Sequence, residues 1–146
     1  MSTAFLDSSA LMKLYADEPD ADDVRSLSPL AISQIARVEV PAALWRKHRM
    51  GELSPAAAGV LIAEFEADYF GTKQEPERFA VVLIASEVLD SAATLAGRHR
   101  LRAYDAVQLA SACALRDLIQ DLVFFAAYDT DLNSAAVAEG LGVLDV

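Results

Sequence analysis

The sequence predicts an α/β protein built around a mostly parallel sheet. Short apolar runs of strand length alternate with longer segments of helical pattern along the 146 residues. Glycine and proline mark several of the boundaries between them, as they do at helix ends. Continuous apolar strands that alternate with helices are typical of sheets buried on both faces, whose neighbouring strands run parallel.

Five apolar runs are expected to form the strands, and most of them lead into a polar residue. The first run ends at Asp7, the second at Ser33, and the fourth is followed closely by Asp129. In open α/β sheets, ligands bind outside the carboxyl ends of the strands, so these polar residues are candidates for a site. The predicted strands are residues 3–6, 30–32, 79–84, 122–127 and 142–146.

Seven segments have the pattern of helices. Gly51 and Gly97 follow two of them, and Ser54 precedes Pro55 in the order typical of a helix N-cap and first helical position. The face of the helix that starts at Pro55 is apolar, which suits either the core or a partner protein. The predicted helices are residues 9–16, about 21–27, 34–50, 55–69, 87–96, 106–118 and 132–139.

The composition fits a single globular domain over residues 1–146. Hydrophobic residues make up 54% of the chain and charged residues 23%, and the mean hydropathy is +0.27. No apolar run approaches the roughly 18 to 20 residues that span a bilayer, and the start lacks the basic region of a secretion signal. We therefore expect a cytoplasmic protein with no membrane contact, whose single cysteine, Cys113, is a buried thiol.

The chain is strongly acidic, with a formal net charge of −10 and a pI of about 4.5. This charge argues against a protein that holds nucleic acid through a general basic surface. It still allows a divalent cation, a basic protein, or nucleic acid held at a local basic patch. Two short segments, "RKHR" at residues 46–49 and "RHRLR" at residues 98–102, could form such patches, although either could be an ordinary solvated face.

Asp7 and Asp129 are expected to lie at the same edge of the sheet if the first and fourth strands are neighbours. Each stands just after an apolar run and just before a helical segment. The structural alternative for each is a helix N-cap or an Asx-turn.

Glu39 is unusual because it has no ion-pair partner within its own helix. Its position beside Val38, Ala42 and Trp45, which we expect to form the buried stripe, makes an uncompensated carboxylate costly unless Glu39 reaches solvent. Its neighbours three and four positions away are Ile35, Ala36, Ala42 and Ala43.

Asp105 precedes an apolar helical segment and is expected to be its N-cap. Together with Gln108 it resembles a capping box, with aspartate in place of serine or threonine.

Four clustered carboxylates would raise one another's pKa unless a cation lay among them. Oxygen-only ligands favour Mg²⁺ or Mn²⁺ over zinc. The two histidines, His48 and His99, show no metal-ligand spacing.

Four segments in order resemble the PIN-domain ribonucleases, in particular the toxin component of VapBC toxin–antitoxin pairs. They are "FLDSSALMKLYADEP", "SQIARVEVPAALWRK", "HRLRAYDAVQLASACAL" and "FFAAYDTDLNSAAVAEGL". The resemblance implies a three-layer α/β/α sandwich with a mostly parallel central sheet. It also implies RNA as substrate, a cognate protein antitoxin and a homodimer.

The resemblance places the family's acidic quartet on Asp7, Glu39, Asp105 and Asp129. Asp7 and Asp105 would hold Mg²⁺ or Mn²⁺ most directly, and Glu39 and Asp129 would complete the shell. The chain departs from the family pattern at Ala127, two residues before Asp129, where the family often has a small hydroxyl residue. This difference puts the role of Asp129 in doubt, and Asp131 could partly substitute for Asp129.

The resemblance to a ribonuclease also suggests which residues bind the substrate. Ser9 is expected to donate a hydrogen bond to a metal ligand or a phosphate, and three arginines are expected to touch phosphate. They are Arg98, Arg100 and Arg102.

Other readings fit less well. A haloacid-dehalogenase phosphatase wants an aspartate where Ser9 stands, a receiver domain wants an acidic pair beside Asp7, and no P-loop is present. The remaining alternative is a catalytically silent PIN-like domain that acts as a protein-binding module.

Overall fold

The five strands form one sheet in the order β3-β2-β1-β4-β5, and every neighbouring pair is parallel. The computed structural model describes residues 2–144. The prediction of a mostly parallel sheet is confirmed. The strands are β1 Ser2–Leu6, β2 Leu30–Ser33, β3 Phe79–Val82, β4 Leu122–Ala126 and β5 Gly142–Val143.

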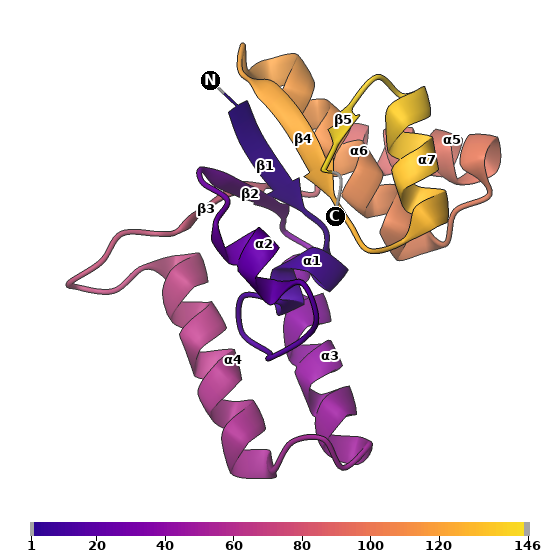
Figure 1. Cartoon of the computed structure of the whole chain (residues 1–146). Coiled ribbons are helices and arrows are strands. Elements are labelled where there is room, and N and C mark those ends of the chain that lie inside the picture. The colour runs from indigo at the N-terminus through magenta and orange to yellow at the C-terminus, as the bar shows by residue number, and fades with distance from the viewer. Residues whose placement is uncertain (1, 145–146) are drawn as a thin grey trace.

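The helices lie on the two faces of the sheet (Figure 1). The first four helices pack on one face, where α3 and α4 form a long pair that extends beyond the sheet, and the last three cover the other. This is the expected three-layer α/β/α arrangement. The helices are α1 Ser8–Met12, α2 Ala21–Arg25, α3 Ala36–Arg49, α4 Pro55–Phe70, α5 Ser86–His99, α6 Ala103–Leu118 and α7 Thr130–Ala138.

Side chains of the central strands alternate between two buried clusters, one on each face. Leu6 and Ile32 belong to the cluster under α1, α3 and α4. Phe5 and Phe125 belong to the cluster under α5, α6 and α7, where their rings stack with centroids 5.9 Å apart. Because both faces are covered, the strands are mostly apolar, which is why the sequence shows continuous runs.

The carboxyl ends of β1 and β4 meet at the centre of the sheet. Leu6 pairs with Ala126, and the backbone N–H of Asp7 donates to the carbonyl oxygen of Ala126 at 3.0 Å. The condition on which Asp7 and Asp129 were expected to share an edge is therefore met, because β1 and β4 are neighbours and bring Asp7 and the segment that leads to Asp129 together.

Several predicted boundaries were wrong by a few residues. The first helix ends at Met12 rather than residue 16, and β3 ends at Val82 rather than residue 84. The last two residues of the predicted final strand lie outside the described range. None of the helices within residues 2–144 is long and apolar enough to span a membrane.

The predicted buried face of α3 was also wrong. Val38 is 67% exposed and Trp45 39% exposed, and Ala42 is exposed as well. The buried stripe is formed instead by Ala36, Val40 and Leu44. Alanine, valine and other apolar residues occur on both sides of α3, so the hydrophobic pattern alone did not fix which side packs on the sheet.

Candidate functional site

Asp7 is a buried carboxylate at the carboxyl end of β1. It is 5% exposed and caps α1, with its Oδ1 accepting hydrogen bonds from the N–H of Ala10 at 2.9 Å and from the Ser9 hydroxyl at 2.7 Å. Burial raises the pKa of Asp7 to about 6, against the opposing effect of these two bonds; the charges of Asp105 and Glu39 add to the increase. The N-cap role and a place in an acidic cluster are therefore combined in one residue.

Glu39 lies in the first turn of α3, directed to the same edge by two hydrogen bonds. Its Oε1 accepts from the Ser8 hydroxyl and from Nε2 of Gln108, both at 2.8 Å. Ser8 and Gln108 were not predicted as site residues. A buried glutamine one turn after Asp105 on an otherwise apolar helix was the signal that could have revealed Gln108.

Asp105 does not cap α6, so that prediction was wrong. The helix begins at Ala103, its N-cap is Arg102, and Asp105 lies in the first turn with its side chain half-buried. The proposed capping box is absent, because Gln108 bonds to Ser8 and Glu39 instead. Burial raises the pKa of Asp105, and the charge of Asp129 raises it further, whereas Arg102 lowers it.

Asp129 is the N-cap of α7, as its structural alternative predicted. Its Oδ1 accepts from the N–H of Leu132 at 3.0 Å. The amide nitrogen of Asn133 bonds to the carbonyl oxygen of Ala127 at 2.9 Å, in the segment where the family often has a hydroxyl side chain. Asp131 is exposed, and with Arg100 it lines a separate surface hollow of about 330 Å³.

The four acidic residues are thus gathered closely enough for the charges of neighbouring carboxylates to raise the pKa of Asp7 and of Asp105. Asp7 responds to Glu39 and Asp105, and Asp105 responds to Asp129. Within residues 2–144, however, no three side chains of His, Cys, Asp or Glu are placed to hold one metal ion together.

This arrangement fits a hard cation held by one or two carboxylates and by water. Mg²⁺ commonly binds in this way, because it keeps several of its waters. The donors are carboxylate oxygens, and an adjacent cation would offset the cost of ionising the buried Asp7.

The three predicted substrate-binding arginines lie in different surroundings. Arg98 donates to Glu139 at 2.8 Å and is engaged in that ion pair, to which His99 also contributes. Arg102 is exposed and lies near enough to Asp105 to lower its pKa. Arg100 ends α5 in a left-handed backbone conformation, with φ of 56°. Of the three, Arg102 is the one whose charge lowers the pKa of a residue of the acidic cluster.

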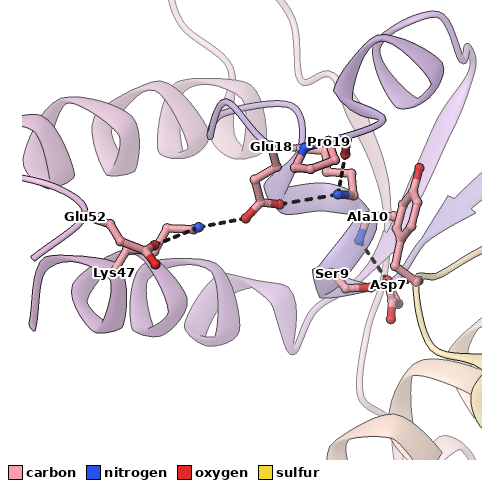
Figure 2. Close-up of polar contacts among 9 residues, drawn as sticks. Asp7, Ser9, Ala10, Glu18, Pro19, Lys47 and Glu52 are labelled. Atoms are coloured by element: carbon pink, nitrogen blue, oxygen red, sulfur yellow. Dashed lines mark hydrogen bonds and ion pairs between the residues drawn. The ribbon is translucent and has the colours of Figure 1, made fainter. Parts of the chain in front are cut away.

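A series of ion pairs connects the segment after α1 to α3 (Figure 2). Lys47 pairs with Glu18 at 2.8 Å and with Glu52 at 3.3 Å, and Glu18 also faces Lys13 at 3.7 Å. The ammonium of Lys13 lies 4.3 Å from the ring centroid of Tyr128. These residues line a cavity of about 430 Å³ that reaches Ser9, beside Asp7.

A larger hollow of about 590 Å³ runs along α3 from the acidic cluster. Glu39 lies in its wall, and Tyr104, which is 62% exposed, contributes an aromatic ring next to Asp105 in the chain. Arg46 and Arg49 supply positive charge, and neither pairs with an acidic group of the described residues. The hollow therefore combines an apolar wall, one aromatic ring and two free guanidinium groups.

Comparison with known proteins gives matches over nearly the whole chain. A family model described as the PIN domain matches residues 4–138. Ribonuclease VapC46 of Mycobacterium tuberculosis is 31% identical over 148 residues, which cover 99% of this chain and 98% of the relative.

Solved structures with the same fold include proteins of three other organisms. A toxin–antitoxin complex from Klebsiella pneumoniae matches with a TM-score of 0.61 and 20% identity, over 97% of this chain and 95% of that chain. PAE2754 from Pyrobaculum aerophilum matches with a TM-score of 0.62 and 22% identity, over 98% of this chain and 92% of that chain. VapBC-1 from nontypeable Haemophilus influenzae gives a TM-score of 0.60 and 16% identity, over 98% of this chain and 97% of that chain.

These comparisons agree with the geometry of the site and confirm the resemblance seen in the sequence. The matched region contains all four acidic residues, of which Asp7 and Asp129 follow strands β1 and β4, and Glu39 and Asp105 lie in helices α3 and α6. The chain belongs to the PIN domain family.

Proposed function

We propose that this protein is a metal-dependent ribonuclease and the toxin of a type II toxin–antitoxin pair, acting in the cytoplasm as a single PIN-like domain. The observation that carries the proposal is the buried carboxylate of Asp7, which faces the charges of Glu39 and Asp105 at the carboxyl edge of a parallel sheet. The cost of this arrangement falls when a cation binds among the carboxylates, and such perturbed groups cluster at functional sites. The 31% identity to a ribonuclease over almost all of both chains supports the same reaction.

Asp7 and Asp105 would hold Mg²⁺ or Mn²⁺, with Glu39 and Asp129 completing the shell directly or through water. When bound, the ion would lower the pKa of a water and offset negative charge on the phosphate. The protein's own part is to hold these carboxylates in place, and the ion would offset the cost of ionising the buried Asp7. No covalent nucleophile is needed, and Cys113 keeps a structural role, because it is buried and burial raises its pKa.

RNA would approach along the hollow beside α3. Arg46 and Arg49 could pair with its phosphates, and the exposed ring of Tyr104 could stack on a base. Arg102 would place a further positive charge beside Asp105. These local groups explain how a chain with a net charge of −10 could hold an anionic substrate.

The proposed partners are a cognate antitoxin and a second copy of the chain. Two of the similar structures are named as a toxin–antitoxin complex and as VapBC-1, which supports an antitoxin partner. The acidic surface would suit a basic segment of that partner. Exposed apolar side chains on α3, such as Val38 and Trp45, offer contact area for either partner.

The test compares RNA cleavage by the wild type, Asp7→Asn and Asp105→Asn on a panel of structured RNAs. Each protein is assayed with Mg²⁺, with Mn²⁺ and with chelator. We expect cleavage by the wild type that chelator abolishes, and a loss of at least 100-fold in each variant, since each removes a charged oxygen from the proposed ion site. Asp90→Asn, an exposed carboxylate on α5, is the matched control and should cleave like the wild type.

The alternative function is that of a PIN-like protein-binding module without activity. It is favoured by one observation, that no three candidate ligands in residues 2–144 are arranged around one ion. The alternative predicts no cleavage of any RNA and no binding of Mn²⁺ in a calorimetric titration. Equal cleavage by the wild type and both variants would instead show that the acidic cluster is not the active site.

A further inference from the structure

Gln108 is a buried polar residue on α6 that contacts two other elements. It is 2% exposed and lies one turn after Asp105. Its Nε2 donates to Oε1 of Glu39 at 2.8 Å and to the Ser8 hydroxyl at 3.0 Å, and that hydroxyl donates to the same Oε1 at 2.8 Å. The three side chains, from α1, α3 and α6, form a closed triangle.

The chemistry of the triangle fixes the direction of every bond in it. An ionised carboxylate can only accept, so the amide of Gln108 must present its NH₂ group to Glu39. Both bonds converge on Oε1, and among the described residues none donates to Oε2. One oxygen of Glu39 is thereby held by Ser8 and Gln108, and the other is open to a further ligand.

Gln108 is not explained by packing. Its own Oε1 is buried and accepts no hydrogen bond from any residue in the described range. A buried acceptor without a partner costs stability, whereas a methionine of similar length would avoid that cost and lose only the two bonds to Ser8 and Glu39. A polar group kept at a stability cost beside a reactive cluster points to a functional reason.

We propose that Gln108 is a positioning residue that fixes the carboxylate of Glu39 for metal binding. Donors that orient a metal ligand reduce the number of conformations the ligand must give up when the ion binds, and their loss typically costs about 10- to 100-fold in metal affinity or activity. The inference rests on the proposed function, because it assumes that Glu39 helps to hold the ion.

Two variants of nearly the same size separate positioning from packing. Gln108→Met keeps the volume and removes both donors, and Gln108→Glu keeps the shape but sets an acceptor against Glu39. Gln120→Met makes the same chemical change at an exposed position and serves as the control. Each protein is melted, crystallised, titrated with Mn²⁺ by calorimetry without RNA, and assayed for kcat and KM.

For Gln108→Met we expect a melting temperature close to that of the wild type, because the two lost hydrogen bonds and the removed unpartnered acceptor offset each other. We expect Mn²⁺ binding about 10-fold weaker and kcat about 10-fold lower, with a smaller change in KM. Its crystal structure should show the Glu39 carboxylate displaced. Gln108→Glu should lose more of its Mn²⁺ affinity and more of its kcat than Gln108→Met does, because two adjacent carboxylates repel each other when both are ionised. Gln120→Met should match the wild type in every measurement.

Two results overturn the proposal in distinguishable ways. If the wild type binds Mn²⁺ and cuts RNA, and Gln108→Met does both equally well with Glu39 in place, then Gln108 has no positioning role. If the wild type neither binds Mn²⁺ nor cuts RNA, the proposed function fails, and the role of Gln108 in that reaction is overturned with it.

Discussion

The hydroxyl of Ser9 donates a 2.7 Å hydrogen bond to Oδ1 of Asp7, and it also accepts from the backbone N–H of Tyr128 at 3.1 Å. Ser9 therefore joins the carboxyl end of β1 to the segment that follows β4. Ser9 thus makes a hydrogen bond to Asp7, whereas the role of Asp7 as a metal ligand and the contact of Ser9 with phosphate stay predictions.

Replacing Ser9 by alanine should weaken the site more than the fold. Ser9→Ala removes one of two donors to Asp7, so the pKa of Asp7 should rise further and the acid limb of the nuclease pH profile should move to higher pH. The loss in stability should be about 1 kcal/mol, the usual net value of one hydrogen bond. Urea unfolding and a pH–rate profile measure the two effects; an unchanged acid limb would contradict the role given to this bond.

Asp7 should make the metal-free protein less stable as pH rises. Its folded pKa of about 6 lies above its ordinary value of 3.8, so the native state binds this proton more tightly than the unfolded state does. The stabilisation from the protonated form is complete below about pH 4 and is lost as pH rises towards about 6. Above that range the ionised carboxylate should cost about 3 kcal/mol.

Asp7→Asn should therefore be more stable than the wild type at neutral pH and lack this dependence. Asparagine caps helices as well as aspartate does, so the bond from Ala10 can remain. Chemical unfolding of both proteins in chelator, at several pH values, gives the difference in free energy of unfolding. We expect that difference to grow between about pH 4 and pH 6; a constant difference would show that the charge of Asp7 is not the cause.

Two substitutions at Asp129 should separate its capping role from a role at the ion. Asp129→Ala removes the bond to the N–H of Leu132 and should cost about 1 kcal/mol of stability, whereas Asp129→Asn keeps the cap and removes only the charge. If Asp129 completes the ion's shell, both variants should lose activity and only the alanine variant should lose stability. Asp131→Asn is the control that decides between the two aspartates: if it alone loses activity, Asp131 serves at the site in place of Asp129.

Arg102 and Arg98 should differ in their effect on RNA binding. Arg102 lies beside Asp105, whereas Arg98 is paired with Glu139. Arg102→Gln should weaken RNA binding and reduce the slope of log affinity against log salt by about one, and Arg98→Gln should leave both nearly unchanged. Fluorescence anisotropy over a salt series, in chelator, measures this; equal slopes for the two variants would contradict the assignment.

The sequence predicted the sheet well because parallel strands buried on both faces appear as separate apolar runs. The ends of those runs predict that Asp7 and Asp129 share one edge of the sheet if the first and fourth strands are neighbours, and the register of β1 with β4 shows that they are. The start of α6 was placed three residues too late, because Arg102 caps the helix without a side-chain bond and so leaves no capping signature in the sequence.

The triangle around Glu39 could not be predicted from local patterns. It joins Ser8, Glu39 and Gln108, which are separated by 31, 69 and 100 positions along the chain. Local spacing suggested a capping box for Gln108, a short-range use of the same side chain. The buried side of α3 was missed for a different reason, because its exposed side is apolar too and lines the hollow beside the site.

The most direct test of the central claim is a calorimetric titration of Mn²⁺ into the wild type and Asp7→Asn, both without RNA. The account predicts saturable binding to the wild type and an affinity at least 10-fold lower for the variant, which loses a charged ligand while staying folded. Equal affinity in the two proteins, or no binding to the wild type, would contradict the claim that these carboxylates hold a divalent ion.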